Sequence, residues 1–235
     1  MIRKFLFFIL IFNLTACAEL QQVVNQLPQS GGVLSNADIA AGLREALNFG
    51  IEKQVSKLTQ TDGFYKNELV KILLPDELKK VDKALRDIGL SSLADDGLKV
   101  LNRAAEDAVK EATPIFVDAV KGITFTDAKN ILIGNDDAAT KYLTTKTQTA
   151  LYDKFNPVIK NSFSKVGADK IWSNLISKYN NIPFTADVNP DLTDYVTNEA
   201  LKGVYTMIAV EEKDIRTKLS SRTTDLLRKV FALQD

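Results

Sequence analysis

Histidine is absent from all 235 residues of the chain. Its absence excludes Ser-His-Asp and Cys-His catalysis, zinc held by imidazole, and a pH switch that depends on histidine. Acid–base chemistry would have to come from carboxylates, which can act as a pair when their pKa values differ.

Cysteine is almost absent, since the chain contains one, Cys17. A single cysteine has no partner within the chain, so a disulfide framework and a thiolate metal cluster are both excluded. Two interpretations of Cys17 remain, a free or buried thiol and a site of lipid attachment. Its position, directly after an apolar run and two small residues, favours lipid attachment.

An excess of charge of either sign is also missing, because 30 Lys and Arg residues balance 30 Asp and Glu residues. A protein that binds nucleic acid needs a basic surface, so the composition predicts no nucleic-acid partner. No polybasic segment follows Cys17 that would attract anionic lipid. Attachment to a membrane is therefore expected to depend on covalent lipid.

The first 16 residues have the layout of a secretory signal. Arg3 and Lys4 form a basic start, and residues 5–12 are all apolar. A membrane-spanning helix needs about 20 apolar residues, so this run is too short to span and instead fits a signal peptide. We therefore predict that residues 1–16 are a signal peptide and are removed.

Residues 14–17, Leu-Thr-Ala-Cys, resemble the lipobox of bacterial lipoproteins. The resemblance implies that Cys17 becomes the first residue of the mature chain and bears a diacylglyceryl group, with a further acyl chain such as palmitate. Ala18, in place of an aspartate, resembles the enterobacterial signal for sorting to the outer membrane. The expected location is the cell envelope, at the outer membrane and facing the periplasm.

Residues 17–34 are predicted to be the lipidated cysteine and a flexible tether. Gln, Ser, Gly and Pro are frequent after Cys17, a composition typical of linkers. Fully extended, roughly 17 residues reach about 55 Å, which limits how far the folded part lies from the lipid. Residues 35–235 are predicted to form the helical domain.

Apolar residues recur every three or four positions through residues 35–235, a spacing that predicts amphipathic helices. The first such stripe consists of Ile39, Leu43, Leu47, Ile51, Val55 and Leu58. No segment alternates with period two, and no fixed repeat is present. The sequence therefore predicts an all-α fold, an irregular multi-helix bundle of about eight to ten helices in a single domain.

Single residues predict where some of these helices begin, bend or end. The apolar residues within 64–73 predict a short helix. Thr126 is expected to cap a short helix over residues 127–132. Pro114 and Pro157 predict breaks or bends, because a proline inside a helix removes a hydrogen bond and clashes with the preceding turn.

Asp136 and Asp137 form the first candidate binding site, just after Gly134 and before a predicted helix. One interpretation is a cation site made of these carboxylates and a carbonyl oxygen. The other is an acidic start of the helix, which the helix dipole stabilises. The pattern lacks the spaced oxygen ligands of an EF-hand loop.

The second candidate site is the polar group Glu211, Glu212, Arg216 and Arg222 near the end of the chain. Glu212 and Arg216 are four residues apart and would meet on one helix turn. Adjacent residues on a helix point about 100° apart, so Glu211 and Glu212 do not form a catalytic pair by themselves. The alternatives are a salt-bridged helix junction and a cleft shared with the first candidate site.

Two parts of the chain resemble DUF4197, a bacterial family of unknown function. The similar stretches are residues 127–132, 134–140 and 155–157 in the middle, and 194–203, 211–216 and 222–231 at the end. The resemblance covers residues 35–232 and implies an all-helical envelope domain behind a signal sequence. It implies no activity, cofactor or catalytic residue. The family often has a proline where this chain has residues 218–221, which leaves the shape of the last turn open.

The function that the sequence favours is non-catalytic binding by a membrane-anchored helical domain, with an apolar ligand or an envelope protein as partner. An alternative is a structural or assembly component of the envelope. A third is a carboxylate-based hydrolase or lyase, which requires Glu211 or Glu212 to meet Asp136 or Asp137 in a cleft. No phosphate loop, dinucleotide fingerprint, nucleophile elbow or metal-ligand spacing appears, so we predict no catalytic residue, metal or cofactor.

Overall fold

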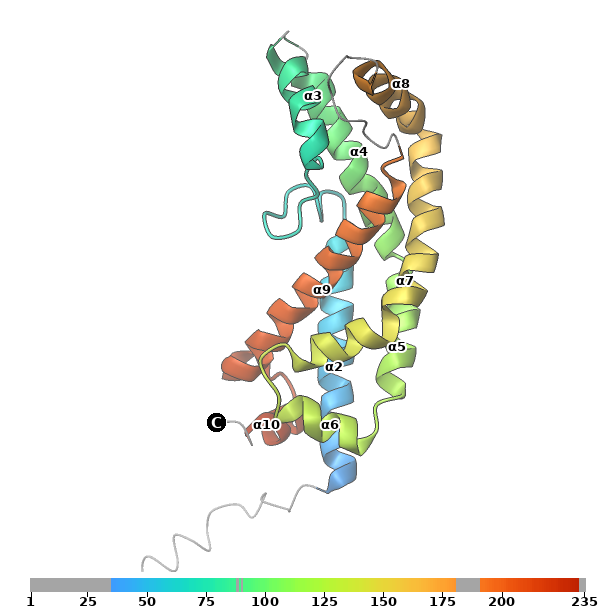
Figure 1. Cartoon of the computed structure of the whole chain (residues 1–235). Helices are drawn as coiled ribbons and strands as arrows, with labels where there is room; N and C mark the ends of the chain where they lie inside the picture. The colour runs from blue at the N-terminus through green and yellow to red at the C-terminus, as the bar shows by residue number, and fades with distance from the viewer. Residues whose placement is uncertain (1–34, 88, 90, 181–190, 233–235) are drawn as a thin grey trace, which may run out of the picture. The chain divides into compact units, whose positions relative to one another are not determined.

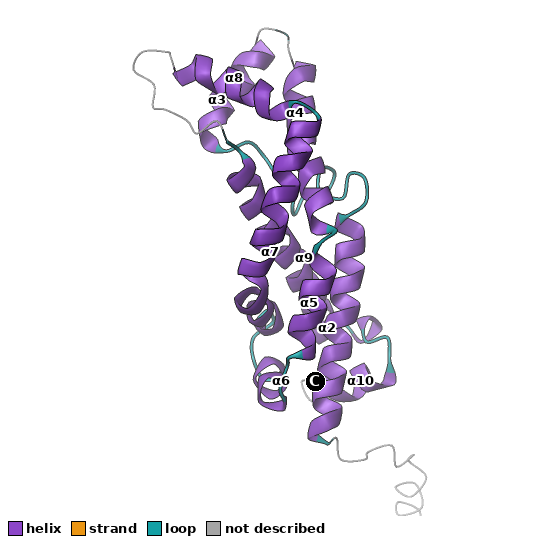
Figure 2. Ribbon diagram, turned by 90° about the vertical axis from the view of Figure 1, so that its right-hand side faces the viewer, coloured by secondary structure: helices purple, strands orange, loops and turns teal. Residues whose placement is uncertain are grey.

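Helices are the regular secondary structure of residues 35–87, 89, 91–180 and 191–232, which the computed structural model describes (Figure 1). No strand occurs among these residues (Figure 2), so the prediction of an all-α fold is confirmed. Cys17 and the predicted signal peptide and tether lie outside the described residues. The elements are α2 (Asn36–Leu58), α3 (Asp76–Asp87), α4 (Ser91–Val109), α5 (Ala112–Lys121), α6 (Phe125–Leu132), α7 (Ala138–Lys165), α8 (Ala168–Asn180), α9 (Thr193–Thr217), the 3₁₀ turn η1 (Leu219–Ser221) and α10 (Asp225–Phe231).

Most of the other helices pack on α2 or α9, whereas α3 packs on α4 and α8 packs on α7. α2 contacts α5, α6, α9 and α10, while α9 also contacts α4 and α7. α7 contacts α4 as well, and α8 follows it at the end of the bundle where α3 and α4 meet (Figure 1). One compact unit extends over Asn36–Asp235. The prediction of a single-domain multi-helix bundle is therefore confirmed.

The apolar stripes of the long helices face the core, as their spacing predicts. In α2 every residue of the stripe from Leu43 to Leu58 is buried, and Ile39 at its start is half-buried. In α9 Val196, Ala200 and Val204 are fully buried. Burial of each Val or Leu side chain contributes about 1.5–3 kcal/mol, so packing of these faces stabilises the bundle more than helix propensity does.

The prediction of a short helix within residues 64–73 is wrong, because turns and extended chain occupy this segment. The backbone N–H of Phe64 donates to a carboxylate oxygen of Glu106, 3.1 Å away, and that of Ile72 donates to Asn102 Oδ1 at 2.8 Å. Asn102 of α4 therefore accepts from the N–H of Ile72, which a helix through this segment would use for its own hydrogen bond. Phe64 and Ile72 are nevertheless buried, as apolar anchors of the segment.

The predicted cap of α6 lies two residues too late. Thr124, not Thr126, is the N-cap: its hydroxyl accepts from the N–H of Asp127, and the Asp127 carboxylate accepts from the N–H of Thr124. This reciprocal capping box satisfies two N–H groups of the first turn, which a cap at Thr126 would not do.

The two prolines have different effects. The chain breaks between α4 and α5, and Pro114 lies in the first turn of α5, where its missing N–H is tolerated. The predicted break near Pro114 is therefore confirmed. Pro157 lies inside α7, which continues through it from Ala138 to Lys165, and the bend expected there stays a prediction.

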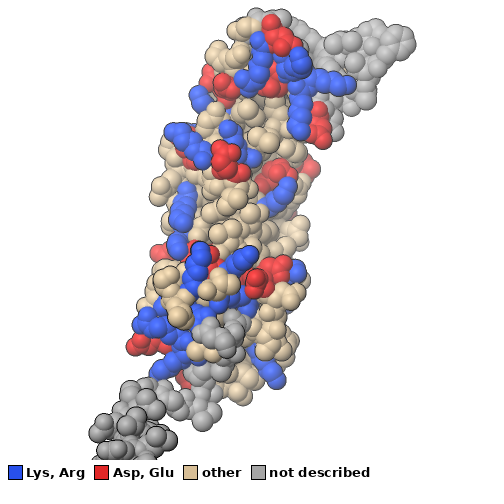
Figure 3. All heavy atoms as spheres, turned by 90° about the vertical axis from the view of Figure 1, so that its left-hand side faces the viewer, with Lys and Arg blue, Asp and Glu red and all other residues tan. Residues whose placement is uncertain are grey.

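Charged side chains of both signs lie on the described surface (Figure 3). On the face drawn in Figure 3, lysine and arginine side chains are interspersed with aspartate and glutamate. Many of the ion pairs join exposed residues three or four apart, such as Lys83 and Asp87, and contribute about 0–1 kcal/mol each. Among the described helices, none has both the length and the apolarity that crossing a membrane requires.

We expect Gly63→Ala to lower the free energy of unfolding by about 1–3 kcal/mol, the usual cost of an overpacked site. A Cβ atom at Gly63 would lie 2.5 Å from the carbonyl oxygens of Lys57 and Leu58, which are backbone atoms of the last turn of α2. Gly122→Ala is the matched control, because its Cβ would meet nothing closer than 3.4 Å. Urea denaturation measures both, and equal stability of the two variants would contradict the steric argument.

Candidate functional site

The predicted polar residues come from α9, from the connection between α9 and α10, and from the connection between α6 and α7. Glu211, Glu212, Arg216 and Arg222 are buried. Asp136 is exposed and Asp137 is half-buried. Glu212 and Arg216 bind ends of helices that are distant in the sequence, whereas Glu211 binds side chains of α2 and Arg222 binds the end of the preceding helix α9.

Glu212 caps the start of α7 from the side of α9. Its two carboxylate oxygens accept from the N–H groups of Ala139 and Thr140 and from the Thr140 hydroxyl, each at 2.8 Å. Asp137 occupies the N-cap position but makes no side-chain cap bond. A carboxylate at a helix N-terminus satisfies free N–H groups and is favoured by the helix dipole. The acidic cap of α7 is therefore supplied by Glu212 rather than by the sequence just before the helix.

Arg216 binds a helix C-terminus, that of α6. Its guanidinium donates to the carbonyl oxygens of Ile131, at 2.8 Å, and Leu132, at 3.2 Å, in the last turn of α6. It also donates to Glu212 at 2.8 Å, and both side chains are 5% exposed. A positive charge at a helix C-terminus is favoured by the dipole. The Glu212–Arg216 pair thus holds the end of α6 and the start of α7 against α9.

Arg222 ends α9 in a similar way. It is 2% exposed and donates to the carbonyl oxygens of Ile215, at 3.1 Å, and Arg216, at 2.9 Å. The carbonyl of Arg222 in turn accepts from Arg228 on α10. Together with η1, these bonds shape the last turn, where the sequence left the conformation open.

Glu211 faces α2 instead. Its oxygens accept from Lys53 Nζ and from Gln54 Nε2. Gly50 makes room for this close approach, since a Cβ there would lie 3.3 Å from the Glu211 side chain. Glu211 and Glu212 therefore stabilise different helix contacts, although they are adjacent in the chain.

Asp136 and Asp137 do not join the buried carboxylates. Asp137 forms an exposed ion pair with Lys141 at 3.0 Å. Among the described residues, no hydrogen bond or ion pair connects either aspartate to Glu211 or Glu212, and no group of three or more acidic or cysteine side chains is arranged to hold a metal ion.

This arrangement suits a helix junction better than acid–base catalysis. Each oxygen of Glu211 and Glu212 already accepts a hydrogen bond within the described chain. The cavity that these two side chains line with Arg216 measures about 20 Å³, which is room for about one water molecule. A substrate would find neither a free carboxylate oxygen nor space beside one.

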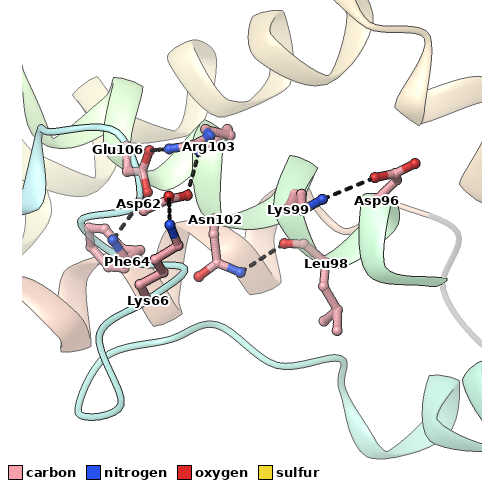
Figure 4. A network of polar contacts seen from close by, with 9 residues as sticks. All are labelled: Asp62, Phe64, Lys66, Asp96, Leu98, Lys99, Asn102, Arg103 and Glu106. Carbon is pink, nitrogen blue, oxygen red and sulfur yellow. Dashed lines mark hydrogen bonds and ion pairs between the residues drawn. The ribbon is translucent and has the colours of Figure 1, made fainter. Parts of the chain in front are cut away.

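A second polar network, which we did not predict, lies along α4 (Figure 4). Buried Glu106 accepts from the N–H of Phe64 and from Arg103, at 2.6 Å, and Arg103 also pairs with Asp62. Asn102 donates to the carbonyl of Ile72 at 2.9 Å. The signal was present in the sequence: Asn102 and Glu106, four residues apart, interrupt an apolar helix face, as polar residues with fixed partners do.

We expect the Asp62→Asn variant to differ in stability from the wild type mainly at neutral pH. The hydrogen bond from Lys66, at 2.8 Å, and then the charge of Arg103 lower the pKa of Asp62. A lowered pKa stabilises the fold above the unfolded value of about 3.9, and this contribution is lost as the pH falls through the folded pKa. Urea unfolding of the wild type and the variant at several pH values measures this difference in stability. A difference that stays constant down to strongly acidic pH would contradict the ionic role.

Two open grooves lie elsewhere on the bundle. The α9 groove, about 660 Å³, lies between residues 69–79 and α9, where the Tyr195 hydroxyl donates to the carbonyl of Leu73 at 2.8 Å. The α6 groove, about 620 Å³, is lined by Ile39, Phe125, Ile133, Asp136, Arg216 and Thr217. Two candidate residues, Asp136 and Arg216, therefore share the wall of one groove, although they do not bind each other.

The comparisons with known proteins identify the family of this chain. A search of curated proteins and a search of solved structures each returned no match. The family model described as "Protein of unknown function (DUF4197)" matches residues 33–232, most of the chain. The protein therefore belongs to the DUF4197 family.

Proposed function

We propose that this DUF4197 protein is a lipoprotein of the bacterial cell envelope, anchored through Cys17, whose helical domain binds a partner without catalysing a reaction. The resemblance of residues 14–17 to a lipobox supports the anchor. Ala18 supports the outer membrane, with the domain facing the periplasm. An apolar ligand or an envelope protein is the expected partner.

The candidate carboxylates form hydrogen bonds between helices, and this observation supports a non-catalytic role. Glu211 and Glu212 are both buried and hydrogen-bonded to α2, α7 and Arg216. A general acid or base needs to reach the proton that it transfers. Since the partners of these carboxylates among the described residues are the protein's own helices, the hydrolase alternative loses the residues that it requires.

The α9 groove is a suitable binding surface. Leu69 and Leu73 on its rim are 63% and 55% exposed. Lysines and a tyrosine also line it, so a partner would meet both apolar and polar groups there. The groove is wide open to solvent, so a bound partner would cover the exposed leucines.

Mass spectrometry of the full-length protein purified from membranes tests this function. A co-purified lipid or other small apolar molecule would support a carrier. A crosslinked protein that is lost in Leu73→Glu, but kept in the control Val166→Glu, would support a binding domain. Val166 is exposed to a similar degree, 59%. Crosslinks unaffected by Leu73→Glu would favour the assembly alternative, and absence of any ligand or partner would contradict binding.

A further inference from the structure

The two most exposed large apolar side chains of the described residues are Ile133, at 75%, and Leu219, at 68%. Ile133 lines the α6 groove, and Leu219 follows two residues after Thr217, which lines the same groove. Phe125 adds a half-buried aromatic ring to its wall. Contiguous apolar surface marks sites of contact with another protein or with a membrane, and the α6 groove with Ile133 in its wall is the place where we look for such a contact.

The position of the α6 groove favours a membrane over another protein as the partner. Ile39, in the first turns of α2, lines the groove, so the groove lies where residues 1–34 join the helical unit. α6 and α10 both pack on α2 at this end (Figure 1). The covalent lipid that we propose on Cys17 would therefore be connected to the protein on the side of the groove.

The reach of the chain strengthens this argument. As the flexible linker that its composition predicts, the segment between Cys17 and α2 has a root-mean-square length of about 21–25 Å. α7 begins beside Glu212 at this end, and its 28 residues measure about 42 Å along the helix axis before Val166. A lipid-anchored tether therefore brings the membrane surface to the near end of the bundle more often than to the far end.

We propose that the end of the bundle at which α2 begins rests on the membrane surface, with Ile133 and Leu219 inserted at the level of the lipid headgroups. This inference rests on the proposed lipid anchor. Lys129 lies on the rim and can extend its charge toward phosphate groups while its aliphatic stem lies on the apolar surface. Asp136 lines the same groove, so the charge of the rim is mixed. The contact is driven by apolar insertion and depends little on anionic lipid.

Thiol-specific fluorescent labelling of the full-length lipidated protein tests the contact. Lipid on Cys17 leaves an introduced cysteine as the sole free thiol of the chain. An environment-sensitive probe is attached to Ile133→Cys, Leu219→Cys or the control Val166→Cys. The proteins are then reconstituted in vesicles of phosphatidylethanolamine, with or without phosphatidylglycerol. All three positions are exposed, so circular dichroism should show unchanged folding.

At positions 133 and 219 we expect emission at shorter wavelength and quenching by quenchers placed on the lipids, with or without phosphatidylglycerol. Position 166 should show neither. Three results would overturn the contact: probes at 133 and 219 that behave like the one at 166, a shift that requires anionic lipid, or a shift that disappears on dilution with excess lipid and so reports a second copy of the chain. Failure of the protein to float with vesicles would instead refute the anchor itself.

Discussion

Replacement of Glu212 by alanine should lower the free energy of unfolding by about 3–5 kcal/mol, because it leaves a buried positive charge without its partner. Arg216, 5% exposed on its side chain, would keep only carbonyl oxygens as acceptors. The start of α7 would also lose the acceptor for the N–H groups of Ala139 and Thr140. Denaturation in urea, followed by far-UV circular dichroism, measures the loss.

Variants of both partners separate the pair from its surroundings. Glu212→Met combined with Arg216→Met should be less destabilising than the sum of the two single substitutions, since removing both charges leaves neither unpaired. Asp136→Ala is the control, because this carboxylate is exposed, and such surface substitutions usually change stability by less than about 0.5 kcal/mol. Additive effects at Glu212 and Arg216, or losses as small as that of the control, would contradict a structural role.

Replacement of Cys17 by serine should abolish membrane association. Serine has no thiol to accept the diacylglyceryl group, and no described helix is able to span a membrane in its place. The variant should also retain residues 1–16 and migrate as the longer precursor. Fractionation and immunoblotting measure both effects, and Gln22→Ser serves as a control that leaves residues 14–17 intact. A Cys17→Ser protein that stays with membranes through washing without detergent would refute lipidation.

Periodicity predicted the helices whose faces are buried. The stripes of α2 and α9 were readable because each apolar residue lies three or four positions from the next. Leu69, Ile72 and Leu73 have similar spacing, but the N–H of Ile72, which a helix would use for its own hydrogen bond, donates to Asn102 of α4. Such long-range competition leaves no trace within the segment itself, so local pattern gives the wrong structure there.

Part of the candidate site was also predictable from spacing along a helix. Glu212 and Arg216 are four residues apart on one helix, and the sequence was enough to predict that they meet. Their other partners, on α6 and α7, are more than 70 residues away. Only the folded bundle brings those helix ends to α9. The sequence therefore left a junction and a cleft as alternatives, and the hydrogen bonds of the structure favour the junction.

The mass of the intact protein extracted from membranes tests the central claim most directly. We expect a chain that begins at Cys17 and whose N-terminal peptide has the added mass of a diacylglyceryl group and a further acyl chain. Digestion should place that mass on Cys17. A chain that begins at another residue, or a Cys17 that carries a free thiol in the membrane-derived protein, would contradict the anchor.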